Sequence, residues 1–153
     1  MVIRFNPQRG ARALPQPIGA GPSSYIFTAV SDVAVTTGLT RFLFPGHTGG
    51  GSASEGPVNG SVPVDGTFKR IEARINTNTT DVSSTITLRV ENADTALIVT
   101  FTAAQTGSQR LATDVSATQG QRFDFEVSIP PGAGSIDDYW VLVEFEPAVG
   151  AKS

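Results

Sequence analysis

The two stretches that decide the fold of this chain are QRFDFEVSIP (121–130) and DDYWVLVEFEP (137–147). In each of them large apolar side chains occupy every second position, and such alternation predicts a β-strand with one buried face. We therefore expect the two strands to share one core, whose members from these stretches are Phe123, Phe125, Val127, Val141, Val143 and Phe145.

The polar positions of the first stretch complete this prediction. Asp124, Glu126 and Ser128 alternate with its apolar residues, and alternate side chains of a strand point to opposite faces of the sheet. We expect all three to face solvent. Asp124 is then an ordinary surface position, and its replacement by alanine should change the free energy of unfolding by less than about 0.5 kcal/mol.

Strand-like runs continue on the N-terminal side of these stretches. They are YIFTAV (25–30), VAVT (33–36), LTRFLF (39–44), TFKRIEARIN (67–76), SSTITLRVEN (83–92), TALIVTFTA (95–103) and the weaker QRLATDVSA (109–117). Many short strands separated by turn residues are typical of β-sandwiches and barrels. A jelly roll has eight strands arranged in two sheets. The sequence predicts an all-β fold without a convincing helix: an antiparallel, jelly-roll-like β-sandwich of about eight strands.

An immunoglobulin-like sandwich is the alternative fold. That fold places a buried tryptophan near the middle of the domain, beside a pair of cysteines. This chain has no cysteine, and its single tryptophan, Trp140, lies in the last strand. The jelly roll is therefore favoured.

Three regions are expected along the chain: an extended Pro/Gly-rich arm over residues 1–24, the sandwich domain over 25–147 and a flexible tail over 148–153. The prolines of the arm discourage both helix and central strand. The arm is then either a disordered terminus or a segment that becomes ordered against a neighbouring subunit. Its apolar residues favour docking, and the expected partner-binding residues are Ile3, Arg4, Phe5, Arg9, Arg12 and Leu14.

The last strand departs from simple alternation. Trp140 and Leu142 lie on the face opposite to its core residues, beside Glu144 and Glu146. Apolar residues on both faces predict a strand that is covered on both sides. The cover is a loop, the arm or another subunit, and we expect Trp140 and Leu142 to belong to a subunit interface.

PGHTGGGSASEGPVNG (45–60) is a long Gly/Ser-rich stretch. It lacks the Lys-Ser/Thr pair of a phosphate-binding loop, so the interpretation is a mobile or linker-like loop. His47, the only histidine, lies within it. Because a loop of this kind is a poor platform for catalytic geometry, we expect a solvated histidine and not a catalytic base.

No catalytic, cofactor-binding or metal-binding set of residues is evident. The chain lacks the His and Cys clusters of many metal sites, and the calcium candidates, 137–138 and 91–94, do not match EF-hand spacing. Asp124 and Glu126 would lie about 7 Å apart along one strand face, which is a glycosidase-like separation. Alternating charges are also what a solvent face carries, so we expect a protein that is not an enzyme and uses no cofactor.

Composition excludes further classes of protein. The 153 residues suggest one domain, which is large enough to hold a core without disulfides. The formal net charge of −3 gives no basic surface for nucleic acid. The chain contains no run of about 18 apolar residues, so no membrane span is predicted. The N-terminus lacks the apolar segment of a secretory signal.

The C-terminal half resembles a known kind of module. The resemblance lies in three segments, TLRVENADTALIVT (87–100), VSATQGQRFDFEV (115–127) and YWVLVEFE (139–146). In this order they are similar to the jelly-roll modules of tailed-bacteriophage virion proteins, namely capsid decoration proteins, head fibres and the head domains of tail fibres. The resemblance consists of short strands and turns, and it carries no catalytic residues.

The resemblance implies a structural virion protein. The expected role is a capsid decoration, or cementing, protein that binds the outer surface of a phage head as a trimer. Its partners are then the major capsid protein and further copies of itself, with no nucleic acid and no membrane. The expected location is the capsid surface of the virion, after assembly in the host cytoplasm. The alternative is a glycan-binding module or tail-fibre head domain for host attachment.

Overall fold

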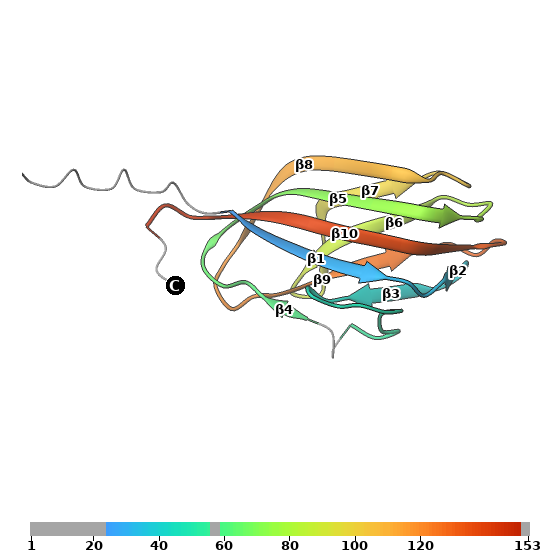
Figure 1. Ribbon diagram of the computed structural model, residues 1–153. Coiled ribbons are helices and arrows are strands. Elements are labelled where there is room, and N and C mark those ends of the chain that lie inside the picture. The colour runs from blue at the N-terminus through green and yellow to red at the C-terminus, as the bar shows by residue number, and fades with distance from the viewer. Residues whose placement is uncertain (1–23, 56–58, 151–153) are drawn as a thin grey trace, which may run out of the picture.

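The chain folds like a long hairpin that has been rolled up, so that its first and last strands are neighbours (Figure 1). The computed structural model describes residues 24–55 and 59–150. In it, β1 (Tyr25–Ser31) runs antiparallel to β10 (Ser135–Pro147). The other long strands pair in the same nested order: β3 (Thr40–Leu43) with β9 (Arg122–Ser128), β5 (Gly66–Asn78) with β8 (Gly107–Ala117), and β6 (Ser84–Val90) with β7 (Ala93–Phe101).

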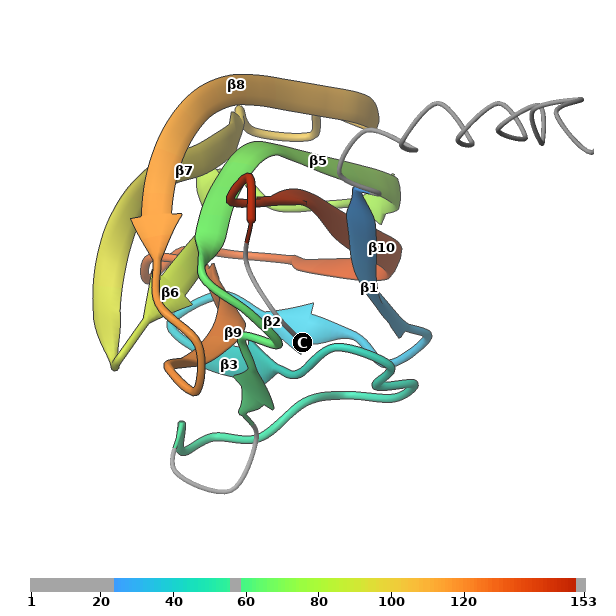
Figure 2. The same ribbon diagram turned by 90° about the vertical axis from the view of Figure 1, so that its left-hand side faces the viewer.

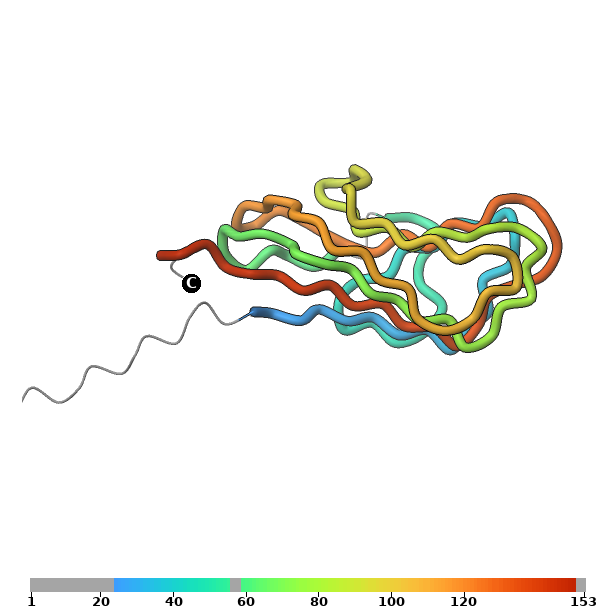
Figure 3. The backbone as a smooth tube through the Cα atoms, turned by 90° about the horizontal axis from the view of Figure 1, so that it is seen from above, coloured from blue at the N-terminus to red at the C-terminus, as the bar shows by residue number. Residues whose placement is uncertain are grey.

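The long strands form two sheets. Sheet A has the order β1-β10-β5-β8 and sheet B the order β3-β9-β6-β7, and the short strands β2 (Val35–Thr36) and β4 (Gly60–Ser61) pair with β10 and β9. Figure 2 shows the two sheets closing around the interior, and Figure 3 shows the long strands of sheet A side by side. Two antiparallel sheets, each with four long strands in this order and one short strand beside them, form a jelly roll, so the predicted fold class is confirmed.

The core lies between the sheets, where the alternating positions of both sheets meet. The six core residues expected from β9 and β10 are all at most 1% exposed, so that prediction is confirmed. Phe68 of β5 links the two layers, because its ring lies 5.2 Å from the ring of Phe123 and 5.0 Å from that of Phe145. Fully burying such a side chain stabilises a fold by about 1.5–3 kcal/mol.

Residues 45–55, which we call the covering segment, hydrogen bond with the edges of both sheets. The amide of Gly46 donates to the carbonyl oxygen of Thr28 on β1 (2.7 Å), and Ser52 exchanges two 2.9 Å hydrogen bonds with Phe42 on β3. Edge strands present unpaired backbone groups, and the covering segment satisfies part of them. The prediction of a mobile or linker-like loop is therefore wrong for these residues.

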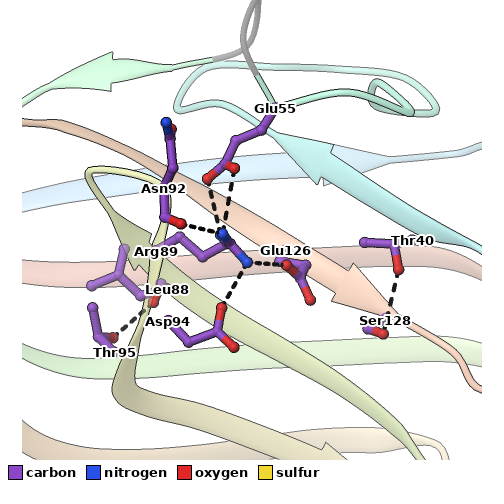
Figure 4. A network of polar contacts seen from close by, with 9 residues as sticks. All are labelled: Thr40, Glu55, Leu88, Arg89, Asn92, Asp94, Thr95, Glu126 and Ser128. Carbon is purple, nitrogen blue, oxygen red and sulfur yellow. Dashed lines mark hydrogen bonds and ion pairs between the residues drawn. The ribbon is translucent and has the colours of Figure 1, made fainter.

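The covering segment also changes the outer face of sheet B. Asp124 points outward as expected, yet it is only 1% exposed, and the side chain of Glu126 is only 16% exposed. The two side chains point away from the core, as predicted, but the prediction that they are exposed to solvent is wrong. The reason is that the end of the covering segment, at Glu55, lies over this face (Figure 4).

Candidate functional site

The outer face of sheet A carries an apolar strip at its β1 edge. Trp140 and Leu142 project from β10 on the side opposite to the core, and both are half-buried. Strand pairing places Trp140 directly beside Val30 of β1, which is 44% exposed, and Ile26 of the same strand is 52% exposed. We call these four residues, Ile26, Val30, Trp140 and Leu142, the β1–β10 face.

Charged residues of β5 and β10 border the β1–β10 face. Arg74 is paired in register with Trp140, and Glu72 with Leu142. Glu144, next along β10, forms a 2.9 Å ion pair with Arg70. Surface ion pairs of this kind contribute little to stability, but an apolar centre with a polar rim is the usual anatomy of a protein interface.

Sequence reasoning found only half of this face. Trp140 and Leu142 were expected at an interface, and the structure places them on an outer face where the described residues leave them partly open to solvent. Ile26 and Val30 were not singled out. The signal was present, because both alternate with the inward-facing Phe27 and Ala29 of β1. The expected arm residues Ile3, Arg4, Phe5, Arg9, Arg12 and Leu14 lie outside the described residues.

A second candidate site lies on the outer face of sheet B and centres on Arg89 of β6 (Figure 4). Its guanidinium pairs with Glu55 (2.9 Å), Asp94 (2.7 Å) and Glu126. It also donates to the carbonyl oxygen of Asn92 and lies 5.7 Å from the centre of the Phe42 ring. One cation thus connects the covering segment with β3, β7 and β9.

Burial and ion pairing act in opposite directions on Arg89. Partial burial works against its charge, but hydrogen bonds to Glu55 and Glu126 outweigh that effect and raise the pKa of Arg89 above its ordinary value. The side chains of Arg89 and Glu55 are 17% and 16% exposed, so their ion pair is largely withdrawn from water. Removing one partner of such a pair leaves an uncompensated buried charge, which is strongly destabilising.

Asp124 is the unusual member of this cluster. Its Oδ1 is buried and has no hydrogen-bond partner among the described residues. Burial, and then the negative charge of Glu55, raise the pKa of Asp124 to about 7, although Arg89 acts to lower it. The expectation that Asp124→Ala barely changes the free energy of unfolding assumed an exposed carboxylate. That assumption is wrong, because Asp124 is buried. Asp124 and Glu126 do not form a solvated pair on an open face.

His47 also differs from its prediction. It is half-buried, and its Nε2 accepts a hydrogen bond from the amide of Gly51 (3.2 Å), while its ring lies 4.7 Å from that of Phe44. The histidine thus shapes the covering segment, and the prediction of a solvated loop residue is wrong. The reason is that the segment folds back on itself along the sheet edges.

The acidic residues of the two calcium candidates, 137–138 and 91–94, have other partners. The Glu91 carboxylate accepts from the amide of Arg122, Asp94 pairs with Arg89, and Asp138 accepts from Asn76. Within residues 24–55 and 59–150, no group of three or more His, Cys, Asp or Glu side chains is arranged to hold a metal ion. The same part of the chain contains no helix that could cross a membrane.

Comparison with known proteins identifies no family. No family model matches the chain, and no curated protein matches it. Among solved structures, a chain from the structure of infectious bursal disease virus Gx strain is similar with a TM-score of 0.37 and 14% sequence identity. The match covers 99% of this chain but only 42% of that one. At this level of similarity it carries no argument about function.

Proposed function

We propose that this chain is a structural virion protein of a tailed bacteriophage: a decoration protein that binds the outer surface of the capsid as a trimer. The β1–β10 face carries this proposal. The outer face of a solvated antiparallel sheet normally carries polar side chains. Here it presents Ile26, Val30, Trp140 and Leu142 together, and an apolar patch with a charged rim marks an interaction surface.

A second copy of the chain is the proposed occupant of the β1–β10 face. The covering segment occupies the edge of β1 at Thr28 and Val30, so a neighbouring copy would pack on the outer face of β1 and β10. Closed symmetric assemblies bury the same patches in every subunit. The similarity of residues 87–146 to phage jelly-roll modules, which are commonly trimeric, favours three subunits. A jelly roll alone assigns no function.

The major capsid protein is the proposed second partner. Residues 1–24 combine apolar side chains with three arginines, Arg4, Arg9 and Arg12. Such a segment suits a groove that is apolar and acidic, where charge orients the encounter and apolar anchors hold it. The proposed location is the capsid surface after assembly in the host cytoplasm, and the proposed role is binding without catalysis.

The arrangement of aromatic residues favours this role over glycan binding. A sugar site would need exposed aromatic side chains that together form a platform. Trp140 lies on the outer face of β10, whereas Tyr139 is fully buried. Tyr25 is paired in register with the inward-facing Phe145 and stacks on Phe27 (6.1 Å). The three candidates therefore do not share one surface.

The test measures the mass of the full-length chain by light scattering at micromolar concentration, followed by binding to purified capsids. We expect a trimer, and Leu142→Glu should give a folded monomer because a charge would be buried in the interface. Ile98→Glu is the matched control, since Ile98 is 37% exposed on β7 of the other sheet. A wild-type chain that is monomeric both in solution and on capsids would contradict the proposal.

A further inference from the structure

We propose that the covering segment is a pH-responsive latch, which is held closed on sheet B in mildly acidic solution and loosens as the solution approaches neutral pH. The proposal concerns the fold itself and does not depend on the proposed function. It rests on how residues 45–55 are fixed to the outer face of sheet B and on the charges that they bury there.

The far end of the covering segment is fixed mainly through charge. Backbone hydrogen bonds hold its first residues to β1 and its middle to β3 through Ser52 and Phe42. Glu55 at its end is held by Arg89, with 2.9 Å between Oε1 and Nε. Asp124 lies on the same face of sheet B and is 1% exposed, and the negative charge of Glu55 acts on it there.

The closed cluster contains too many carboxyl groups for its single cation. Arg89 from β6 faces Glu55 of the covering segment, Asp94 of β7, and Asp124 and Glu126 of β9. The next cation on the same face of β9, Arg122, has an exposed side chain, and β3 contributes only Thr40 and Phe42 to this face. If all four carboxyls were ionised, the cluster would hold three uncompensated negative charges. A proton on Asp124 relieves the crowding.

The direction of the pH effect follows from this burial. With the latch closed, the pKa of Asp124 is about 7, against an ordinary value of 3.8. Below about pH 4 the group is protonated whether the latch is open or closed, so the closed state keeps its full stability. As the pH rises to about 7, the open state releases the proton first, and the opening equilibrium grows by up to about tenfold per pH unit. Above that range it changes no further.

His47 belongs to the covering segment but not to the cluster around Arg89. Its Nε2 accepts a hydrogen bond from the Gly51 amide, whereas Ser52 hydrogen bonds with Phe42 and not with the histidine. A substitution of His47 therefore separates the contribution of this side chain from that of Asp124.

The test is amide hydrogen exchange of the full-length protein between pH 5 and pH 8, with each rate divided by its intrinsic rate. We expect the protection of Ser52 and its neighbours to fall at least tenfold from pH 5 to pH 7.5 and then to level off. In Asp124→Asn, which cannot ionise, the fall should be less than threefold. Asp114→Asn, at an exposed carboxylate paired with Lys69, should behave like the wild type, and His47→Gln should keep the fall.

Several results would overturn the latch. One is protection of the covering segment that does not change with pH, and another is the same fall in Asp124→Asn as in the wild type. A third is protection equal to that of Leu88 in the core at every pH, because the segment would then open only by global unfolding. If Asp124→Asn fails to fold, Glu55→Gln replaces it: losing the neighbouring charge must reduce the fall, and an unchanged fall counts against the latch.

Discussion

Arg89 and Asp124 are directly opposite each other on β6 and β9, yet the guanidinium makes its ion pairs with Glu55, Asp94 and Glu126. Asp124 is left buried, with an Oδ1 that has no hydrogen-bond partner among the described residues. A cross-strand pair of opposite charges would ordinarily stabilise the sheet. Here burial, and then the negative charge of Glu55, raise the pKa of Asp124 to about 7, and this has consequences for stability.

The first prediction concerns the pH dependence of folding. Below about pH 4 Asp124 is protonated in both the folded and the unfolded chain. Between the ordinary pKa of 3.8 and the folded pKa of about 7 only the unfolded chain loses the proton, so the Asp124 contribution to stability falls as the pH rises. Thermal unfolding should therefore show that Asp124→Asn stabilises the protein relative to wild type more at pH 7.5 than at pH 4. A difference between the two proteins that stays constant with pH would refute this.

The second prediction concerns the core of sheet B. Phe125→Ala removes a fully buried ring and should lower the free energy of unfolding by about 3–5 kcal/mol, as buried Phe truncations do. Ile98→Ala on β7, where the side chain is 37% exposed, should lower it by less than about 1 kcal/mol. Urea titrations of both variants give the comparison, and equal losses would mean that the strand faces are assigned wrongly.

The third prediction concerns two asparagines of β5. Asn78 is buried; its amide donates to the carbonyl oxygen of Gln105 (2.8 Å), and its Oδ1 accepts from the amide of Thr80 (3.0 Å). Asn78→Ala leaves these buried groups unpaired and should cost about 2–3 kcal/mol. Asn76 is exposed and bonds only with exposed partners, so Asn76→Ala should cost less than about 0.5 kcal/mol. The denaturation midpoints of the two variants should therefore differ clearly. Equal midpoints would show that the hydrogen bonds of Asn78 do not stabilise the fold.

The fourth prediction separates backbone strain from steric conflict at two glycines with positive φ. A Cβ at Gly120 (φ +85°) would meet nothing within 4 Å, whereas a Cβ at Gly134 (φ +93°) would lie 2.1 Å from the carbonyl oxygen of Thr79. Gly120→Ala should therefore cost only the conformational strain, about 1–2 kcal/mol. Gly134→Ala should cost clearly more, because the turn before β10 must move. Similar melting temperatures for the two variants would exclude this steric explanation.

The fifth prediction concerns the N-terminal arm. Deleting residues 1–18 should leave the sandwich folded, as judged by circular dichroism, and weaken trimer assembly or capsid binding. Phe5→Ala should weaken binding more than Arg9→Ala in moderate salt, because apolar anchors hold a complex while exposed charges mainly speed its formation. Truncated protein that binds capsids as tightly as the full chain would move the search for the binding surface to the sandwich.

Local alternation was enough to predict the buried face of each strand. In β9 and β10 every second residue is large and apolar, and a pleated strand turns that period directly into one face. The core positions Phe123, Phe125, Val141 and Phe145 follow from this pattern alone. The outward direction of Asp124 and Trp140 follows from it as well.

Tertiary structure alone decided what covers each outer face. The charge of Glu55 acts on Asp124 although Glu55 lies about 70 residues earlier in the chain, and Trp140 lies beside Val30, 110 residues away. Both pairs are neighbours because the rolled hairpin brings early segments against late strands, and no local period encodes such distant neighbours. The period of a strand determines where a side chain points, but whether it meets water, a carboxylate or an apolar neighbour depends on which distant segment the topology places over it.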